Sequence, residues 1–80
     1  MMLEILSPEQ KLFSGEVESV TLPGTLGEFT VLRRHAPLIS SLNQGEIKYR
    51  LKNGDEQRVA IRNGFVEVLK NHVSVCIEEV

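Results

Sequence analysis

Few side chains in this sequence are of the types that bind metals or catalyse reactions, and their spacing suits neither role. His35, His72 and Cys76 are the only soft metal ligands, and no close pair of them flanks a turn as structural metal sites require. The serines are scattered, and no G-x-S-x-G motif or oriented base would activate one as a nucleophile. Glu16 and Glu18 share a strand face, which is typical of solvated carboxylates. We predict no catalytic residue and no metal site.

Nucleotide and phosphate motifs are also missing. The stretch "GTLGEF" at 24–29 lacks the Lys-Ser/Thr pair of a P-loop, and no G-x-G-x-x-G occurs. His72 falls in an expected turn, where a solvated histidine is the simplest interpretation. Cys76 alternates with Val75 and Ile77, so it is interpreted as a small apolar residue that is buried or half-buried. No cofactor is therefore predicted.

Length and charge limit the remaining classes. Eighty residues form a single domain, 1–80, with a small core, since a chain of this size buries only about 60% of its unfolded surface. The net charge of −2 with mixed signs argues against a nucleic-acid surface. The start "MMLEILSPEQ" has no basic region, and no apolar run approaches the roughly 18 residues of a membrane span. We expect a soluble chain that touches a membrane only peripherally.

The second half of the chain reads as short strands. Asn53-Gly54 and Asn63-Gly64 predict tight hairpin turns, and Lys70-Asn71-His72 predicts a third. Between the turns, apolar residues alternate with polar ones, as in half-buried strands. The inward residues are predicted to be Ile47, Tyr49, Leu51, Val59, Ile61, Val66, Val68, Val73, Val75 and Ile77. This half is predicted to be a four-stranded meander.

The first half is also predicted to be β. Leu3 and Ile5 share a face, Ser7–Gln10 forms a turn, and a long strand follows that is interrupted at Gly15 by a bulge or bend. Simple alternation leaves Leu6, Val20 and Leu22 outside the core. A further turn is expected at Leu22-Pro23-Gly24. Many short strands with frequent turns indicate an all-β sandwich or barrel.

The segment "LPGTLGEFTVLRRHAPLISSLNQGEIKY" closely resembles the N-terminal domain of the ε subunit of F-type ATP synthases. That family typically reads Leu-Pro-Gly-x-x-Gly-Glu-x-Gly-Val-Leu-Pro-Gly-His-Ala-Pro-Leu. The resemblance extends to "LEILSPEQKLFSGEVESVTLPG" upstream and "RNGFVEVLKNHVSV" downstream, so it covers essentially the whole chain. The departures are Thr30 in place of a glycine, and Arg33-Arg34 in place of Pro-Gly.

The resemblance implies a ten-stranded β-sandwich of two five-stranded sheets. It also implies a noncatalytic rotor subunit of the central stalk, which docks on the γ subunit and the ring of c subunits and couples ion-driven rotation to ATP synthesis. Contact with the catalytic α/β head would be indirect. The family's C-terminal helical hairpin has no counterpart in these 80 residues, so neither ATP binding nor hairpin inhibition is expected. Such a subunit would lie at the cytoplasmic face of the bacterial inner membrane, peripherally, and be a monomer when isolated.

Family positions also imply contact residues. Glu28, Phe29, Arg33 and Arg34 would face the c ring, where Glu28 could accept charge-assisted hydrogen bonds from ring arginines. Ser7, His35 and Ser40 would face γ. For each charged residue, an ordinary solvated side chain is the competing interpretation, and His35 could instead hold its own loop.

A function of a different class, a small ligand-binding sandwich, stays open. A carbohydrate site would need exposed aromatic residues, yet the chain has no Trp, and its one Tyr, Tyr49, is predicted on the apolar face. A small hydrolase would need a nucleophile and base, which the sequence lacks.

Overall fold

The computed structural model describes all of residues 1–80 and contains only strands, turns and loops. The seven strands are β1 (Met2–Leu6), β2 (Lys11–Gly24), β3 (Gly27–Leu32), β4 (Leu38–Leu42), β5 (Gly45–Leu51), β6 (Glu56–Leu69) and β7 (His72–Glu79). The all-β prediction is confirmed. No helix long and apolar enough to cross a bilayer is present.

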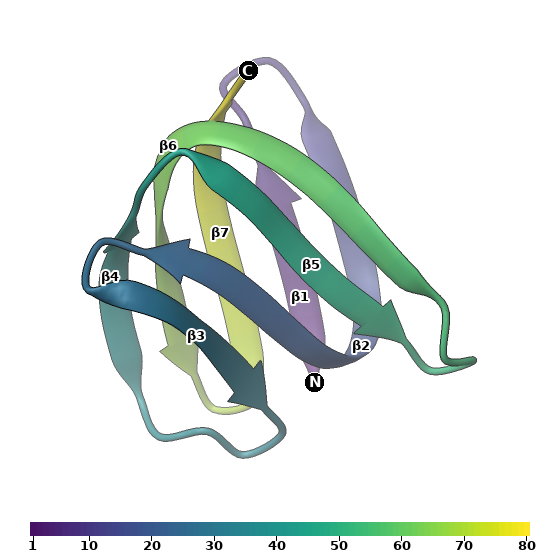
Figure 1. Ribbon diagram of the computed structural model, residues 1–80. Helices are drawn as coiled ribbons and strands as arrows, with labels where there is room; N and C mark the ends of the chain where they lie inside the picture. Colours follow the sequence, from purple (N-terminus) through teal and green to yellow (C-terminus); the bar gives the residue numbers. More distant parts are fainter.

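The strands form two layers that enclose the core (Figure 1). One layer contains the start of β2, then β1, β7, the end of β6, and β4. The other contains β3, the end of β2, β5, and the start of β6. Strands β1 and β7 are parallel, and every other neighbouring pair is antiparallel.

The strand count differs from the expected ten in two separate five-stranded sheets. The structure has seven strands in one continuous hydrogen-bonded sheet, because β2 and β6 each run from one layer into the other. Each crossing coincides with a register shift, between Val17 and Ser19 in β2 and between Ile61 and Asn63 in β6. Such bulges bend a strand and increase its twist, which allows one strand to serve both layers.

The bend in β6 corrects the prediction of a hairpin at Asn63-Gly64. Both residues lie inside β6, and β6 pairs with β7 on both sides of them. The predicted four-stranded meander is therefore three strands, β5, β6 and β7. The predicted turns at Asn53-Gly54 and Lys70-Asn71 are confirmed, and Gly54 has a φ of 95°.

The core contains sixteen buried apolar residues from both layers. They are Met1, Leu3, Ile5, Val17, Val20, Leu22, Val31, Leu42, Ile47, Tyr49, Ile61, Val66, Val68, Val73, Val75 and Ile77. The inward residues predicted for the second half are all buried or half-buried. The prediction that Val20 and Leu22 lie outside is wrong, since both are fully buried. The bulge after Val17 adds a residue and inverts the alternation.

The turn expected at Leu22-Pro23-Gly24 lies further along the chain. Leu22, Pro23 and Gly24 continue β2, and the chain reverses at Thr25-Leu26, with Gly24 paired to Gly27. Gly27 has a φ of 128°, a conformation that residues with a side chain rarely adopt. The reversal therefore places Leu26 at the tip of a hairpin.

Candidate functional site

A hollow of about 410 Å³ lies beside the β2–β3 hairpin and β4. Its lining residues are Gly24, Leu26, Gly27, Glu28, Phe29, His35, Leu38 and Ser40. The structure therefore brings together four of the predicted contact residues, Glu28, Phe29, His35 and Ser40. We call this feature the hairpin hollow.

The hairpin that forms one wall of the hollow is firmly held. The Thr25 N–H donates to the Ser41 carbonyl at 3.1 Å, and the two side-chain hydroxyls lie 3.0 Å apart. The Asn43 N–H donates to the Pro23 carbonyl at 2.8 Å. A Cβ on Gly24 would fall 2.8 Å from the Phe29 ring, so only glycine permits this close packing. These contacts tie the hairpin to β4 and the segment after it.

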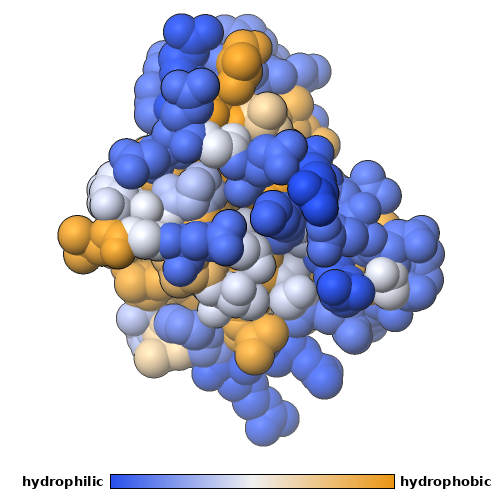
Figure 2. All heavy atoms as spheres, viewed as in Figure 1, coloured by the Kyte–Doolittle hydropathy of each residue, from blue (hydrophilic) through white to orange (hydrophobic).

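Leu26 is the apolar residue at the tip of this hairpin, and it is fully exposed at 103%. Figure 2 shows a hydrophobic projection at the left edge of the molecule, where Figure 1 places the β2–β3 turn. An exposed leucine on a rigid turn suits insertion into a partner's pocket, because little ordering entropy is lost on binding. Leu26 was not among the predicted contact residues, because the turn was expected at Leu22-Pro23-Gly24 and lies instead at Thr25-Leu26.

Glu28 and His35 differ in how they are held. The Glu28 carboxylate is 62% exposed and 3.9 Å from the Lys48 ammonium, a loose surface pair worth little stability. The His35 ring Nδ1 lies 2.7 Å from the Ala36 carbonyl oxygen, which can only accept, so Nδ1–H donates. His35 thus holds its own loop, as the competing interpretation expected, and it still lines the hollow. Phe29 is half-buried and packs against the core.

The turn that carries Arg33 and Arg34 keeps a geometry suited to Pro-Gly. The His35 N–H donates to the Leu32 carbonyl at 3.2 Å, and Arg34 has a φ of 64° while that of Arg33 is not positive. A positive φ at the third residue alone is the pattern of a type II turn, which favours Pro second and Gly third. Left-handed backbone costs a residue with a side chain about 1–2 kcal/mol. Arg34 is therefore strained.

The β6–β7 turn is hydrogen-bonded to the turn that carries Arg33 and Arg34. Lys70 and Asn71 connect β6 to β7 with φ values of 50° and 63°. The Asn71 Oδ1 accepts from the Arg34 N–H at 3.0 Å, and its carbonyl accepts from the Met2 N–H at 3.1 Å. Asn71 thus links the arginine turn, the β6–β7 turn and the start of β1.

We expect Asn71→Ala to lower the free energy of unfolding by about 1–2 kcal/mol, because alanine tolerates left-handed backbone poorly and cannot bond Arg34. Asn71→Gly keeps the backbone freedom and loses only the side-chain bond, so it should cost less. Urea unfolding of both variants measures the difference. Equal losses would contradict the role assigned to the backbone conformation.

Arg33, Arg34 and Lys70 therefore lie on adjoining turns, and we call them the cationic end. All three are exposed, and no carboxylate lies within ion-pair distance of any of them. Glu16 lies near enough for the Arg33 charge to act on it. Its pKa is lowered chiefly by a hydrogen bond from the Met1 ammonium at 3.1 Å and that group's charge, with smaller effects of Lys52 and Arg33.

Ser7 lies apart from the hairpin hollow. It lines a different hollow of about 420 Å³ on the outer face of β1, β6 and β7, together with Leu6, Phe65 and Cys76. Phe65 is 52% exposed there. We call this feature the apolar hollow. Cys76 is half-buried as predicted, and Leu6 is the one residue of Leu6, Val20 and Leu22 that lies outside the core.

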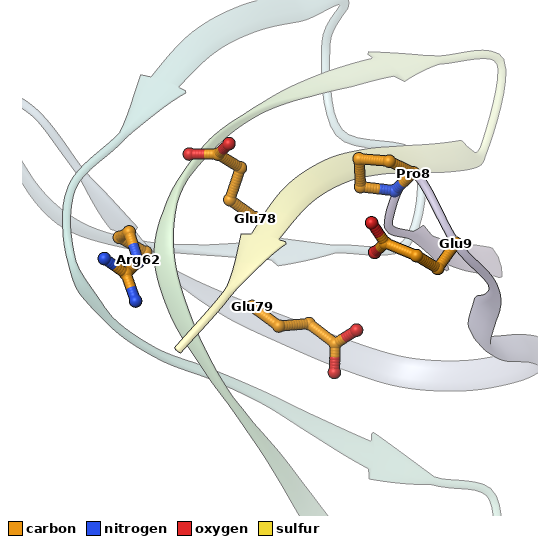
Figure 3. A pocket seen from close by; sticks show the side chains of 5 residues that line it. All are labelled: Pro8, Glu9, Arg62, Glu78 and Glu79. Atoms are coloured by element: carbon orange, nitrogen blue, oxygen red, sulfur yellow. The ribbon is translucent and has the colours of Figure 1, made fainter.

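A third hollow, of about 350 Å³, is lined mainly by charged residues (Figure 3). Pro8, Glu9, Arg62, Glu78 and Glu79 line it, near the ends of β1 and β7. No group of three or more His, Cys, Asp or Glu side chains is placed to hold a metal ion. The carboxylates instead accept from amides, since Gln10 Nε2 lies 3.4 Å from Glu79 and Asn63 Nδ2 lies 2.7 Å from Glu78.

The outer face of β5 and the start of β6 carries charged side chains of both signs, which form ion pairs with one another. Arg58 contacts both Glu46 and Glu56, at 3.3 and 3.0 Å, and Arg50 lies 3.7 Å from Glu56. Figure 2 shows this side of the molecule largely hydrophilic. Large apolar side chains are exposed elsewhere: Leu26 at the hairpin tip, Leu32 in β3, Ile39 in β4, Phe65 and Leu69 in β6, and Val80.

The chain matches a family model described as "ATP synthase, Delta/Epsilon chain, beta-sandwich domain" over residues 1–80. It is 39% identical over 77 residues to the ATP synthase epsilon chain of Syntrophomonas wolfei, covering 96% of this chain and 56% of that one. It is 41% identical over 78 residues to the epsilon chain of Chlorobaculum tepidum, covering 98% of this chain and 89% of that one. This chain spans little more than half the length of several other relatives, such as the epsilon chain of Nitratiruptor, of which it covers 59%.

Solved structures share the fold. The Euglena gracilis mitochondrial ATP synthase, in a cryo-EM structure of "OSCP/F1/c-ring", contains a chain that superposes with a TM-score of 0.91 at 23% identity, covering 96% of this chain and 49% of that one. A chain in the Tetrahymena thermophila mitochondrial ATP synthase "central stalk/cring" structure superposes with a TM-score of 0.84 at 14% identity, covering 98% of this chain and 63% of that one. At these identities the likeness concerns the sandwich alone.

Proposed function

The chain belongs to the delta/epsilon chain family of ATP synthases, as its β-sandwich domain, and from this we propose that it is a noncatalytic subunit of the central rotor stalk of an F-type ATP synthase. It docks on the γ subunit and the c ring, and it helps them turn as one body during ion-driven ATP synthesis. It is peripheral, at the cytoplasmic face of a bacterial inner membrane. The observation that carries the proposal is the unbroken match over all 80 residues.

The architecture suits a part that transmits torque. A body that passes force between two partners must resist shear between its own layers. Here β2 and β6, each of fourteen residues, cross from one layer to the other and join the layers by covalent backbone. Interface contacts then need shape complementarity and rigidity rather than a reactive side chain.

The hairpin hollow is the proposed meeting point of both partners. Glu28, Phe29, Arg33 and Arg34 face the c ring, and His35 and Ser40 face γ. Because Glu28, Phe29, His35 and Ser40 line one hollow, the two contacts adjoin. Leu26 inserts at this junction as the apolar anchor.

Ser7 marks a second proposed contact with γ. Its surroundings in the apolar hollow include Leu6, Phe65 and Ile77, so a γ segment bound there would bury apolar side chains. Central, well-packed apolar anchors dominate most protein interfaces, whereas the charged rim contributes little. The charged outer face of β5 and β6 stays in solvent.

We expect Leu26→Asp to leave folding stability within about 0.5 kcal/mol of wild type, since the side chain is fully exposed. Its affinity for the γ–c-ring assembly should fall at least tenfold, about 1.4 kcal/mol. Val80→Asp is the matched control, because Val80 is 71% exposed and lies outside all three hollows. Equal affinities of the two variants would contradict a docking role for the hairpin tip.

A further inference from the structure

The turn at Arg33-Arg34 carries two arginines, although its backbone conformation favours proline and glycine at these positions. Its hydrogen bond from His35 to Leu32 and the φ of 64° at Arg34 would suit Pro at 33 and Gly at 34. Proline would pre-set the φ of position 33, and glycine would remove the strain at 34. Strain that persists in a small domain points to a role for the side chains it carries.

The cations of the cationic end are also free to bind. Lys11, Lys48, Arg50 and Arg58 each contact a carboxylate, whereas the other five cations, Arg33, Arg34, Lys52, Arg62 and Lys70, contact none. Of these five, only Arg33, Arg34 and Lys70 lie on the two adjoining turns. The Arg34 N–H to Asn71 bond, at 3.0 Å, holds the two turns against each other. Three exposed cationic residues thus lie on two turns whose backbones are held together.

We propose that Arg33, Arg34 and Lys70 form a docking site for a carboxylate-bearing protein segment of the stalk and ring assembly. This inference rests on the proposed function. The planar guanidinium groups match carboxylates through paired N–H donors, which favours an acidic protein segment over a diffuse anionic surface. Such a site would supplement the hairpin hollow with a contact specific to chains that carry arginines in this turn.

A variant with proline and glycine in this turn should fold more stably but lack the two cations, so it separates effects on binding from effects on folding. The double variant Arg33→Pro/Arg34→Gly is compared with wild type in thermal unfolding and in binding to a detergent-solubilised γ–c-ring assembly from cells that lack this chain. We expect Tm to rise by about 4–8 °C while Kd rises at least tenfold. The affinity of wild type should also depend more steeply on salt than that of the variant.

Two further variants and one probe make the outcome specific. Arg33→Lys/Arg34→Lys keeps the charge and the strain, so it should recover part of the affinity without the gain in Tm. Arg62→Ala removes an arginine that forms no ion pair and lines the third hollow, with Glu78 and Glu79. It should leave Kd within about twofold, as expected for a charge outside the contact. Vesicles containing anionic phospholipid test the lipid alternative.

The possible binding results either support the docking site or contradict it. Equal binding of Arg33→Pro/Arg34→Gly and wild type would overturn it, and so would a loss confined to the anionic vesicles. Failure of wild type itself to bind the assembly would overturn the proposed function, and this inference with it. A higher Tm with weaker binding to the assembly is the result expected.

Discussion

Gly64→Ala is expected to remove about 3 kcal/mol or more from the free energy of unfolding, which is most of what a core this small supplies. A Cβ at this position would lie 2.4 Å from the Cys76 carbonyl oxygen and 3.1 Å from the Ile77 Cα. Both atoms are backbone of the paired strand β7, so neither can move without breaking the β6–β7 ladder. The variant should be largely unfolded at 37 °C.

Gly15→Ala is the matched control for that effect. Its Cβ would meet only the Phe13 ring, at 3.2 Å, and a side chain can turn aside where backbone cannot. We expect a loss of no more than about 1 kcal/mol, at the lower end of the range for overpacking. Circular dichroism with urea titration of both variants measures the contrast. Similar midpoints would show that β6 and β7 are less closely apposed than described.

Leu22→Ala should lower the free energy of unfolding by about 2–5 kcal/mol, the range for a leucine removed from a packed core. Leu22 is fully buried, because the bulge after Val17 turns this part of β2 inward. Leu26→Ala is the matched control, since Leu26 is fully exposed four residues later on the same hairpin. It should change the unfolding free energy by no more than about 0.5 kcal/mol.

The comparison between these two leucines tests the strand register directly. Unbroken alternation along β2 would put Leu22 outside, and its replacement would then cost almost nothing. A small effect of Leu22→Ala in guanidinium unfolding would therefore contradict the inverted alternation. A large effect of Leu26→Ala would show that the hairpin tip packs against the domain rather than projecting from it.

Local sequence predicted the strands better than their connections. Alternation identified the buried faces of β1, β5 and β7 because each of these strands stays within one layer. The same rule failed for Val20 and Leu22, since a bulge in β2 shifts the period and has no distinct local signal. Asn53-Gly54 and Asn63-Gly64 look identical, yet only the first is a turn. Pairing of β6 with β7, a distant contact, decides the second.

The individual contact residues of the candidate site were predicted only through family resemblance. Glu28, Phe29, His35 and Ser40 do lie together, but their composition alone indicates no chemistry. Leu26 and Phe65 were missed, because an exposed apolar residue is recognisable only once the turns and the strand faces are known. The same is true of Lys70, which joins Arg33 and Arg34 through the contact of Asn71 with the arginine turn.

Affinity capture of the chain from gently solubilised membranes of its source cell, with bound proteins identified by mass, tests the stalk assignment most directly. A subunit of the central stalk should be recovered with the γ subunit, the catalytic α and β subunits and the c ring in a defined ratio. Recovery of the folded chain alone, under conditions in which the remaining synthase is intact, would contradict it. The sandwich would then have been reused for another role, such as binding a small ligand.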